Sequence, residues 1–279
     1  MKKGINIWSF PKSLGVIDCI KLAKKAGFDG IELALAEKGE LSLESAESEI
    51  LSFRKEAERV GIEITSVATG LYWSYPLTSG IKEVRQTAMC IVRKQLDIVA
   101  LLGVDTILVV PGAVGVDFKP GSEVVDYDIA YDRALEALKE LAAYAEMKKV
   151  SIGIENVWNK FLLSPLEMRE FIDKIGSDYL GAYLDVGNTI YTGYPEHWVK
   201  ILGSRIKKVH LKDYRRKVGS TAGFVDLLSG DVDFPDVIEQ LKEIGYSDYL
   251  IAEMTPYKNY ADQIIYNTSA SMDRILERI

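Results

Sequence analysis

SIGIENVWNKFLLSPLEMREFIDKIGSDYLGAYLDVGN, the sequence of residues 151–188, contains one complete strand–helix–strand unit. Two short apolar runs, Ser151–Glu155 and Gly181–Asp185, enclose a segment of helical periodicity at Pro165–Ile175. A serine before the first-turn proline is a typical helix start, and Gly176 directly after the last turn is a typical left-handed helix end. Because both runs are almost continuously hydrophobic, they are typical of parallel strands that helices cover. The stretch therefore predicts a βαβ unit.

The same alternation extends over the whole chain. The other expected strands are Gly4–Trp8, Gly30–Leu35, Ile64–Ala68, Thr106–Val110, Lys207–Leu211 and Leu250–Met254. The other expected helices are Val16–Lys25, Leu43–Arg59, Glu83–Leu102, Asp128–Lys148, Glu196–Leu202 and Phe234–Ile244. Most of these helices end at a glycine that precedes the next strand. Eight such units in 279 residues predict an α/β fold, a single-domain (β/α)8 TIM barrel that spans residues 1–279.

An open, doubly wound parallel sheet is the alternative architecture. Such a sheet would carry a glycine-rich phosphate-binding turn after its first strand. This chain has Trp8-Ser9-Phe10-Pro11 at that place. The longer irregular stretches, residues 69–80, 111–126 and 213–233, each follow the C-terminal end of a strand, which is where barrels build their active sites. The sequence therefore favours the closed barrel.

The overall composition indicates a soluble, globular protein. Hydrophobic residues make up 48% of the chain and charged residues 27%, with a net charge of −7 and a pI near 5.1. This acidic balance argues against a general nucleic-acid-binding protein, which needs a basic surface to replace phosphate counter-ions. No stretch approaches the roughly 18 apolar residues of a membrane-spanning helix, and the first ten residues lack the apolar segment of a signal peptide. We therefore expect a cytoplasmic protein that binds neither nucleic acid nor membrane.

The two cysteines, Cys19 and Cys90, lie in separate apolar helical runs without the spacing of a CxxC motif. We predict that both are buried, reduced thiols.

Four ionisable residues stand at or near the C-terminal ends of the last four expected strands: Glu155, Asp185, His210 and Glu253. They are separated by 30, 25 and 43 positions, which is about one βα unit each, with the last interval lengthened by the loop after the seventh strand. One charged residue at a strand end is commonly a solvated terminus or a helix cap. Four on successive strands are different, because a barrel brings successive strand ends to one mouth.

Charged groups in a barrel interior need a partner, because an unpaired buried ion costs several kcal/mol. A shared divalent metal ion is such a partner. Three carboxylates and one imidazole form a mostly hard-oxygen site, which suits Mn²⁺, Mg²⁺ or Co²⁺ better than a structural Zn²⁺. We favour Mn²⁺ and keep Mg²⁺, Co²⁺ and Zn²⁺ as alternatives. Four protein ligands on an octahedral ion leave two positions for the adjacent oxygens of an α-hydroxyketone.

The segments around these residues read IGIEN, YLDVGN, KVHLKD and IAEM, and they resemble the metal-binding strand ends of the xylose-isomerase-like barrel superfamily. GDVDFPDVIEQLKEIGYSDYLIAEM also resembles the final loop, helix and strand of that superfamily, and the similar organisation covers essentially the whole chain. The group contains sugar-phosphate isomerases and epimerases and also endonuclease IV. Within it, the chain resembles in particular the ketose 3-epimerases, the ribulose-phosphate 3-epimerase type and the proteins assigned as hexulose-6-phosphate isomerases.

The resemblance implies a function for the four residues. Glu155, Asp185, His210 and Glu253 would be the metal ligands, and Glu155 and Glu253 would also be the catalytic acid/base pair. The implied reaction is 3-epimerisation of a small ketose or sugar phosphate through a cis-enediolate, which a bound metal stabilises. One glutamate would remove a proton from one face of the substrate and the other would return a proton to the opposite face.

Substrate contacts are less well defined by the resemblance. Arg216 lies where the epimerases keep a substrate-binding arginine, although Arg215 and Lys217 beside it also fit a solvated basic turn. Asn188 stands where those epimerases have a histidine, and Phe161 where they have a glutamate, so the free-ketose pattern is incomplete. We predict Asn188, Arg216, Trp8 and Trp158 as substrate-binding residues, with the two tryptophans either lining the sugar pocket or packing in the core. His197 at a helix start predicts a capping or surface role.

Several alternative functions share the same metal site. They are an aldose–ketose isomerase of the hexulose-phosphate type, a hydroxypyruvate isomerase and an inosose-dehydratase-like lyase. A sugar-binding barrel without activity would not need two glutamates at a metal, and a DNA-repair endonuclease would need several more histidines than the two in this chain. The expected partner is a small-molecule sugar or sugar phosphate, and apolar residues on the outer helices are compatible with a homo-oligomer.

Overall fold

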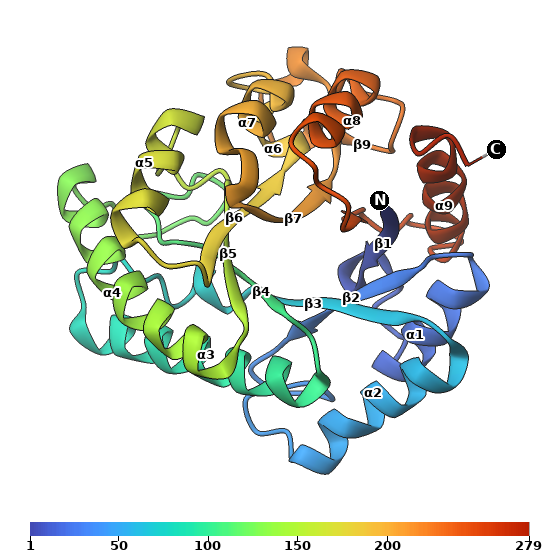
Figure 1. The fold of residues 1–279 in the computed structure, drawn as a ribbon, viewed down its shortest axis with the longest axis horizontal. Coiled ribbons are helices and arrows are strands. Elements are labelled where there is room, and N and C mark those ends of the chain that lie inside the picture. Colours follow the sequence, from blue (N-terminus) through green and yellow to red (C-terminus); the bar gives the residue numbers. More distant parts are fainter. Residues whose placement is uncertain (279) are drawn as a thin grey trace.

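Eight parallel strands close into a barrel in a computed structural model that describes residues 1–278 (Figure 1). The strands follow each other around the barrel in the order β1-β10-β7-β6-β5-β4-β3-β2, and every neighbouring pair is parallel. They are β1 (Lys2–Asn6), β2 (Gly30–Leu35), β3 (Glu63–Thr69), β4 (Thr106–Val109), β5 (Ser151–Glu155), β6 (Leu180–Asp185), β7 (Ile206–Leu211) and β10 (Tyr249–Ala252). The predicted (β/α)8 fold is confirmed.

Helices surround the barrel on the outside (Figure 1). They are α1 (Val16–Lys25), α2 (Glu47–Val60), α3 (Lys82–Leu102), α4 (Tyr127–Lys148), α5 (Pro165–Ile175), α7 (Pro195–Leu202), α8 (Phe234–Glu243) and α9 (Gln263–Ile275), with a single helical turn, α6 (Val186–Thr189), directly after β6. The expected start of α5 is present, because Ser164 Oγ accepts a hydrogen bond from the Glu167 N–H at 3.2 Å. Gly176 ends the same helix with φ of 70°, a left-handed conformation that glycine adopts without strain.

Most predicted boundaries lie within two residues of the observed ones, and two of the shifts have a clear local cause. The first strand ends at Asn6 instead of Trp8, because the Asn6 side chain accepts the Trp8 N–H and starts a 3₁₀ turn. Helix α2 begins at Glu47 instead of Leu43, because the Leu43 N–H donates to the Ala36 carbonyl in a preceding turn. Helices α6 and α9 were not predicted, and α9 completes the eighth βα unit.

The buried residues form two hydrophobic clusters. The larger one joins the outward-facing side chains of the strands to the inward faces of the helices. The smaller one fills the barrel itself, with Ala68, Leu108, Tyr183, Tyr249 and Ile251. Polar side chains are also buried on the strands, and they include Glu32, Ser66 and His210. The interior is therefore apolar in one layer and charged in another, and the charged layer leads to the candidate site.

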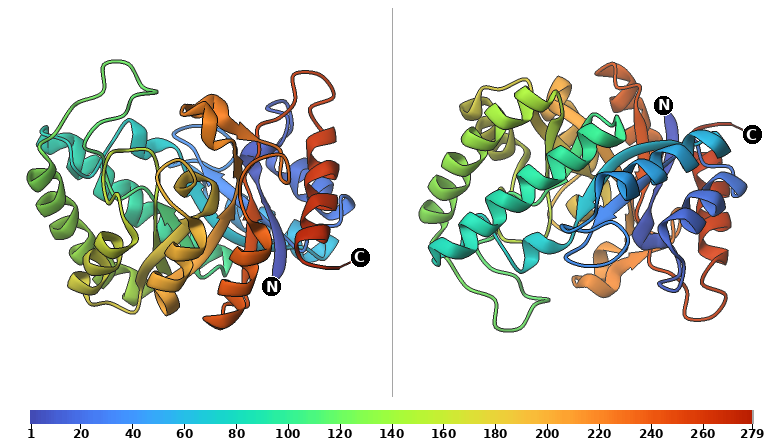
Figure 2. Two further views of the ribbon diagram at one scale, coloured as in Figure 1. Left: turned by 90° about the horizontal axis from the view of Figure 1, so that it is seen from above. Right: turned by 90° about the horizontal axis from the view of Figure 1, so that it is seen from below.

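Long loops leave the barrel at one end. The segments after β4, β7 and β10 project in the same direction, as Figure 2 shows. The loop after β7 contains a small antiparallel hairpin of β8 (Asp213–Tyr214) and β9 (Phe224–Val225). The Asp213 carboxylate ties this loop together by accepting the N–H groups of Gly230 at 2.8 Å and Val232 at 3.2 Å. This end of the barrel has the space and the loops to receive a ligand.

The prediction that both cysteines are buried is confirmed for Cys19 and wrong for Cys90. Cys19 is buried, but Cys90 is exposed, because its position on α3 faces solvent while Ile91 and Val92 face the barrel. Both thiols are free. Within residues 1–278, the structure contains no helix that is both long and apolar enough to cross a membrane.

Candidate metal centre

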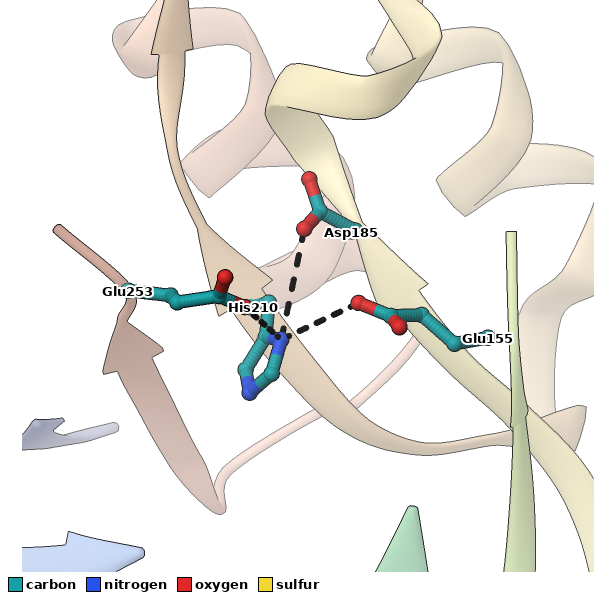
Figure 3. Close-up of side chains that lie close together, drawn as sticks. All are labelled: Glu155, Asp185, His210 and Glu253. Carbon is teal, nitrogen blue, oxygen red and sulfur yellow. Dashed lines mark hydrogen bonds and ion pairs between the residues drawn. The ribbon is translucent and has the colours of Figure 1, made fainter. Parts of the chain in front are cut away.

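The four strand-end residues predicted from the sequence lie together at one mouth of the barrel (Figure 3). Glu155 ends β5, Asp185 ends β6, His210 is near the end of β7, and Glu253 directly follows β10. One nitrogen or oxygen atom of each side chain lies within 4.8 Å of the corresponding atoms of the others. Because these strands are neighbours in the closed sheet, their ends place the four groups in a single arc.

The imidazole of His210 is at the centre of this group. Its Nδ1 atom lies 3.2 Å from Glu155 Oε1, 3.3 Å from Glu253 Oε2 and 4.0 Å from Asp185 Oδ2. Asp185 and His210 are register partners in the β6–β7 pair, and both are fully buried. The three carboxylates therefore face one ring nitrogen from three sides (Figure 3).

The other ring nitrogen of His210 is held by Glu32, which sequence reasoning missed. His210 Nε2 lies 2.7 Å from Glu32 Oε2. Glu32 is fully buried on β2 and also accepts hydrogen bonds from Ser66 Oγ at 2.7 Å, from the Tyr183 hydroxyl at 2.6 Å and from the Asn6 amide. Burial opposes ionisation of Glu32, but His210 and these donors hold its pKa below the ordinary value. An ionised Glu32 keeps the Nε2 proton in place and leaves Nδ1 facing the carboxylates, as the outer carboxylate of a metal-binding histidine does.

The protonation of the cluster follows from its burial and charges. Burial lowers the pKa of His210, but Glu32 and Glu155 raise it, and the net result is well above the ordinary value. Burial raises the pKa of Glu155 to about 7, although His210 and Lys212 act in the opposite direction. The metal-free centre therefore holds protons that a bound metal would displace.

A second missed residue, Lys212, lies among the carboxylates. Its ammonium is 3.0 Å from Asp185 Oδ2 and 3.2 Å from Glu253 Oε1. Burial lowers the pKa of Lys212, but Asp185 and Glu253 more than offset this and raise it. Each of the two missed residues has a signal in the sequence. Glu32 is a charged residue inside the apolar run GIELAL, which predicts a buried strand. Lys212 follows His210 by two positions, so in an extended chain it lies on the same side as His210.

The chemistry of the donor set fits a divalent metal ion. The buried Asp185 Oδ2 atom faces the Lys212 ammonium at 3.0 Å and has no other donor among the described residues, whereas its partner oxygen Oδ1 accepts the Asn188 N–H at 2.8 Å. A buried carboxylate needs a cation beside it, and a divalent ion at the centre could take the place of this ammonium. Three carboxylates and one imidazole provide the oxygen and nitrogen donors that Mn²⁺, Mg²⁺ and related ions accept, and the geometry does not select among them.

The residues predicted to bind substrate lie in different surroundings. Trp158 Nε1 donates to the Asn188 carbonyl at 3.1 Å, the Asn188 amide donates to the Asn156 carbonyl at 2.9 Å, and both side chains line a cavity of about 210 Å³. The Arg216 guanidinium donates to the Gly193 carbonyl at 3.0 Å and stacks on the ring of Tyr194.

Trp8 and His197 are accessible to solvent. Trp8 lies in the 3₁₀ turn that follows β1 and is 40% exposed. His197 is exposed on α7 beside Tyr194, in agreement with its predicted surface role. A separate cavity of about 360 Å³ is lined by Lys212 and Glu253 together with residues of the β7 loop, so it opens directly beside the cluster.

Comparison with known proteins identifies the family. The family model described as the xylose isomerase-like TIM barrel matches residues 20–274. The chain therefore belongs to the xylose isomerase-like TIM barrel family, which confirms the resemblance seen in the strand-end motifs.

Individual relatives match nearly the whole chain. The Haemophilus influenzae protein named "Putative L-ribulose-5-phosphate 3-epimerase SgbU" is 28% identical over 264 residues, which are 92% of this chain and 90% of that protein. The L-ribulose-5-phosphate 3-epimerase UlaE of Escherichia coli (strain SMS-3-5) is 23% identical over 269 residues, 91% of this chain and 88% of that protein. A solved D-psicose 3-epimerase with D-tagatose, from Clostridium cellulolyticum H10, superposes with a TM-score of 0.82 at 17% identity and covers 99% of both chains. At that identity the structural match supports the fold alone.

Proposed function

We propose that this chain is a divalent-metal-dependent 3-epimerase that acts on a small ketose or ketose phosphate. One observation carries the proposal: Glu155 and Glu253 approach the centre from opposite sides (Figure 3). They come from β5 and from the end of β10, the outer strands of the arc β10-β7-β6-β5, and lie 3.2 and 3.3 Å from His210 Nδ1. Inversion of one carbon requires a group that removes a proton from one face and a group that returns a proton to the other. The names of the relatives support the same reaction.

Glu155, Asp185, His210 and Glu253 are proposed to hold the metal. When bound, a divalent ion would make the C–H proton next to the substrate carbonyl more acidic by drawing electron density from the substrate oxygens. We propose Mn²⁺, because the oxygen-rich donor set suits a hard ion, and keep Mg²⁺, Co²⁺ and Zn²⁺ as alternatives.

The side chains of this protein would move the proton and exclude water. Glu155 is buried at the end of β5 and lies 3.2 Å from His210 Nδ1, so its carboxylate would stand beside a substrate held at the metal and could exchange a proton with it. Glu253 lines the cavity beside the cluster, where a substrate carbon can approach its carboxylate. Glu32 holds the His210 ring in one orientation, so that the centre keeps its shape during proton transfer.

The predicted substrate contacts remain part of the proposal. Trp158 and Asn188 are proposed to contact sugar hydroxyls from the loops after β5 and β6, and Trp8 is proposed to cover the sugar from the end of β1. Arg216 is proposed to bind substrate oxygens, which requires its guanidinium to leave the Gly193 carbonyl.

The test is solvent-deuterium incorporation into a defined panel of ketoses and ketose phosphates. The purified protein is first freed of metal with a chelator and then loaded with Mn²⁺. We expect deuterium at C3 of L-ribulose 5-phosphate or of a free ketose, with loss of exchange when the metal is removed and its return when Mn²⁺ is added.

Other outcomes would replace the proposal with a specific alternative. Deuterium at C1 or C2 would identify an aldose–ketose or hydroxypyruvate-type isomerase, which needs a proton shift on a single face. Elimination of water from an inosose would identify a dehydratase. Exchange that persists without any metal would contradict the metal-dependent reaction.

A further inference from the structure

Lys212 is built into the candidate metal centre. It leaves the end of β7 two positions after His210, and its side chain is 16% exposed. The backbone of Gly187 in α6 packs against the Cβ atom of Lys212. A Cβ atom added at Gly187 would lie only 2.5 Å from Lys212 Cβ. Because a larger residue at position 187 would displace Lys212, the contact between α6 and the end of β7 fixes where this side chain starts.

The ammonium of Lys212 contacts two of the four candidate ligands. It lies 3.0 Å from Asp185 Oδ2, an oxygen with no other donor among the described residues, and 3.2 Å from Glu253 Oε1. The other oxygen of Glu253 faces His210 Nδ1 at 3.3 Å. One oxygen of Glu253 therefore contacts the Lys212 ammonium and the other faces His210. In Asp185 a single oxygen, Oδ2, faces both the ammonium and His210 Nδ1.

A metal ion and this ammonium would compete for the same carboxylate. A divalent ion held by the four residues needs Oδ2 of Asp185, the oxygen that the ammonium now contacts. Two cations within a few ångströms in a buried site repel each other strongly, because few water molecules screen them.

We propose that Lys212 is a positioning residue, an internal counter-ion that holds Asp185 and Glu253 in place in the metal-free chain and that a divalent ion displaces from Asp185. Lys212 thereby limits the affinity of the centre for metal while it keeps the Glu253 carboxylate oriented. This inference concerns the proposed metal site and does not depend on which sugar the protein converts.

The chain offers a matched control on the same strand. Lys208 is also a buried lysine of β7, and its ammonium pairs with Asp248 at 2.5 Å and with Asp105 at 3.3 Å. These aspartates belong to the opposite end of the barrel, so Lys208→Met removes a buried ammonium without touching the candidate centre. Lys212→Arg is the second control, because it keeps the positive charge.

The experiment is calorimetric titration of the metal-free, full-length protein with MnCl₂ at constant pH and ionic strength. We expect Lys212→Met to bind Mn²⁺ roughly tenfold more tightly than the unmodified protein, because one repelling charge is gone. Lys208→Met and Lys212→Arg should bind within about threefold of the unmodified protein. A purely structural role for Lys212 would weaken metal binding or leave it unchanged.

Equal or weaker Mn²⁺ binding by Lys212→Met would overturn the proposal, as would an equal gain in Lys208→Met. If Lys212→Met does not fold, as judged by circular dichroism, Lys212→Gln provides the same test with a polar side chain. Since the titration uses no substrate, failure to find an epimerase substrate would affect the proposed function and leave this result intact.

Discussion

Each end of the barrel buries one lysine of the β7 segment, but the two lysines have different partners. The lower end is where the strands begin, and the upper end is where they finish and where the candidate metal centre lies. At the lower end, Lys208 has a side chain that is 4% exposed, and its two partners reach solvent, with Asp105 74% and Asp248 38% exposed. At the upper end, Lys212 contacts Asp185, which is fully buried, and Glu253, which is 23% exposed.

The difference lies in the balance of charge. The lower aspartates are hydrated as well as paired, so the ion pair is complete without any other group. The upper end gathers four carboxylates, those of Glu32, Glu155, Asp185 and Glu253, against two cationic side chains, Lys212 and His210, and all of these carboxylates except that of Glu253 are buried. Such an excess of acidic groups is destabilising unless bound protons or a further cation offset it. The balanced ion pairs at the lower end therefore indicate a structural role. The imbalance of charge at the upper end indicates a candidate site for a cation.

The largest effect is expected from the glutamates of the upper end. Glu155→Gln and Glu253→Gln each remove a proton-transferring group and keep its shape, so the turnover rate should fall on the order of 10²–10⁴-fold. The measurement is C3 deuterium exchange at saturating Mn²⁺, with the melting temperature as a check on folding. Full activity in either variant would show that the glutamate takes no part in proton transfer.

Glu32→Gln should weaken metal binding although Glu32 is not a candidate ligand. The amide cannot accept as strongly from His210 Nε2, so the ring loses its preferred orientation, and the Mn²⁺ dissociation constant should rise about 10–100-fold. Calorimetric titration measures this directly. An unchanged dissociation constant would mean that the His210 ring is oriented by packing against Tyr183 instead.

A lower-end variant should affect stability without affecting function. Asp248→Asn removes the nearer partner of Lys208 and should lower the free energy of unfolding by about 2 kcal/mol, less than a fully unpaired charge costs, because Asp105 remains. Urea denaturation measures the loss, while Mn²⁺ affinity and turnover of the folded protein should stay unchanged. A change in Mn²⁺ affinity would remove the distinction between the two ends.

The smallest effect concerns the pH dependence of stability. Burial raises the pKa of Glu155 to about 7, above the ordinary 4.5, so the folded, metal-free chain holds this proton more firmly than the unfolded chain. Stability from this group is therefore lost as pH rises from about 4.5 to 7, and the raised pKa of His210 acts in the same direction only above its ordinary value of 6.5. We expect the melting temperature of the metal-free protein to fall as the pH rises over this range. The slope should be smaller in Glu155→Gln and unchanged in Asp248→Asn.

The barrel and the four clustered residues could be predicted from local patterns. Glu155, Asp185 and His210 each stand near the end of an apolar run, and a parallel barrel brings such ends together whatever the details of packing. The start of α2 and the end of β1 were misplaced because single hydrogen bonds, to the Ala36 carbonyl and to the Asn6 side chain, decide them. Exposure of Cys90 depends on the rotation of α3, which a mixed run of apolar residues does not fix.

The residues around the cluster could not be predicted in the same way. Glu32 receives its donors from four other strands, and no local rule says which distant side chain will reach a carboxylate in a buried strand. Lys212 was within reach of sequence reasoning, since alternation along β7 places it on the side of Lys208 and His210. The contact of Arg216 with the Gly193 carbonyl depends on how two loops pack, for which the sequence carries no periodic signal.

Glu32 also links the two halves of the chain. Its partners Tyr183 and His210 follow it by 151 and 178 positions, so they reach it only after the chain has closed a very long loop. Until β6 and β7 join the sheet, Glu32 lacks two of its four partners, so the first five strands cannot complete this hydrogen-bond network. A fragment that ends before Leu180 should therefore fail to form a stable half-barrel. Closure of the sheet and completion of the site are then a single cooperative event in folding.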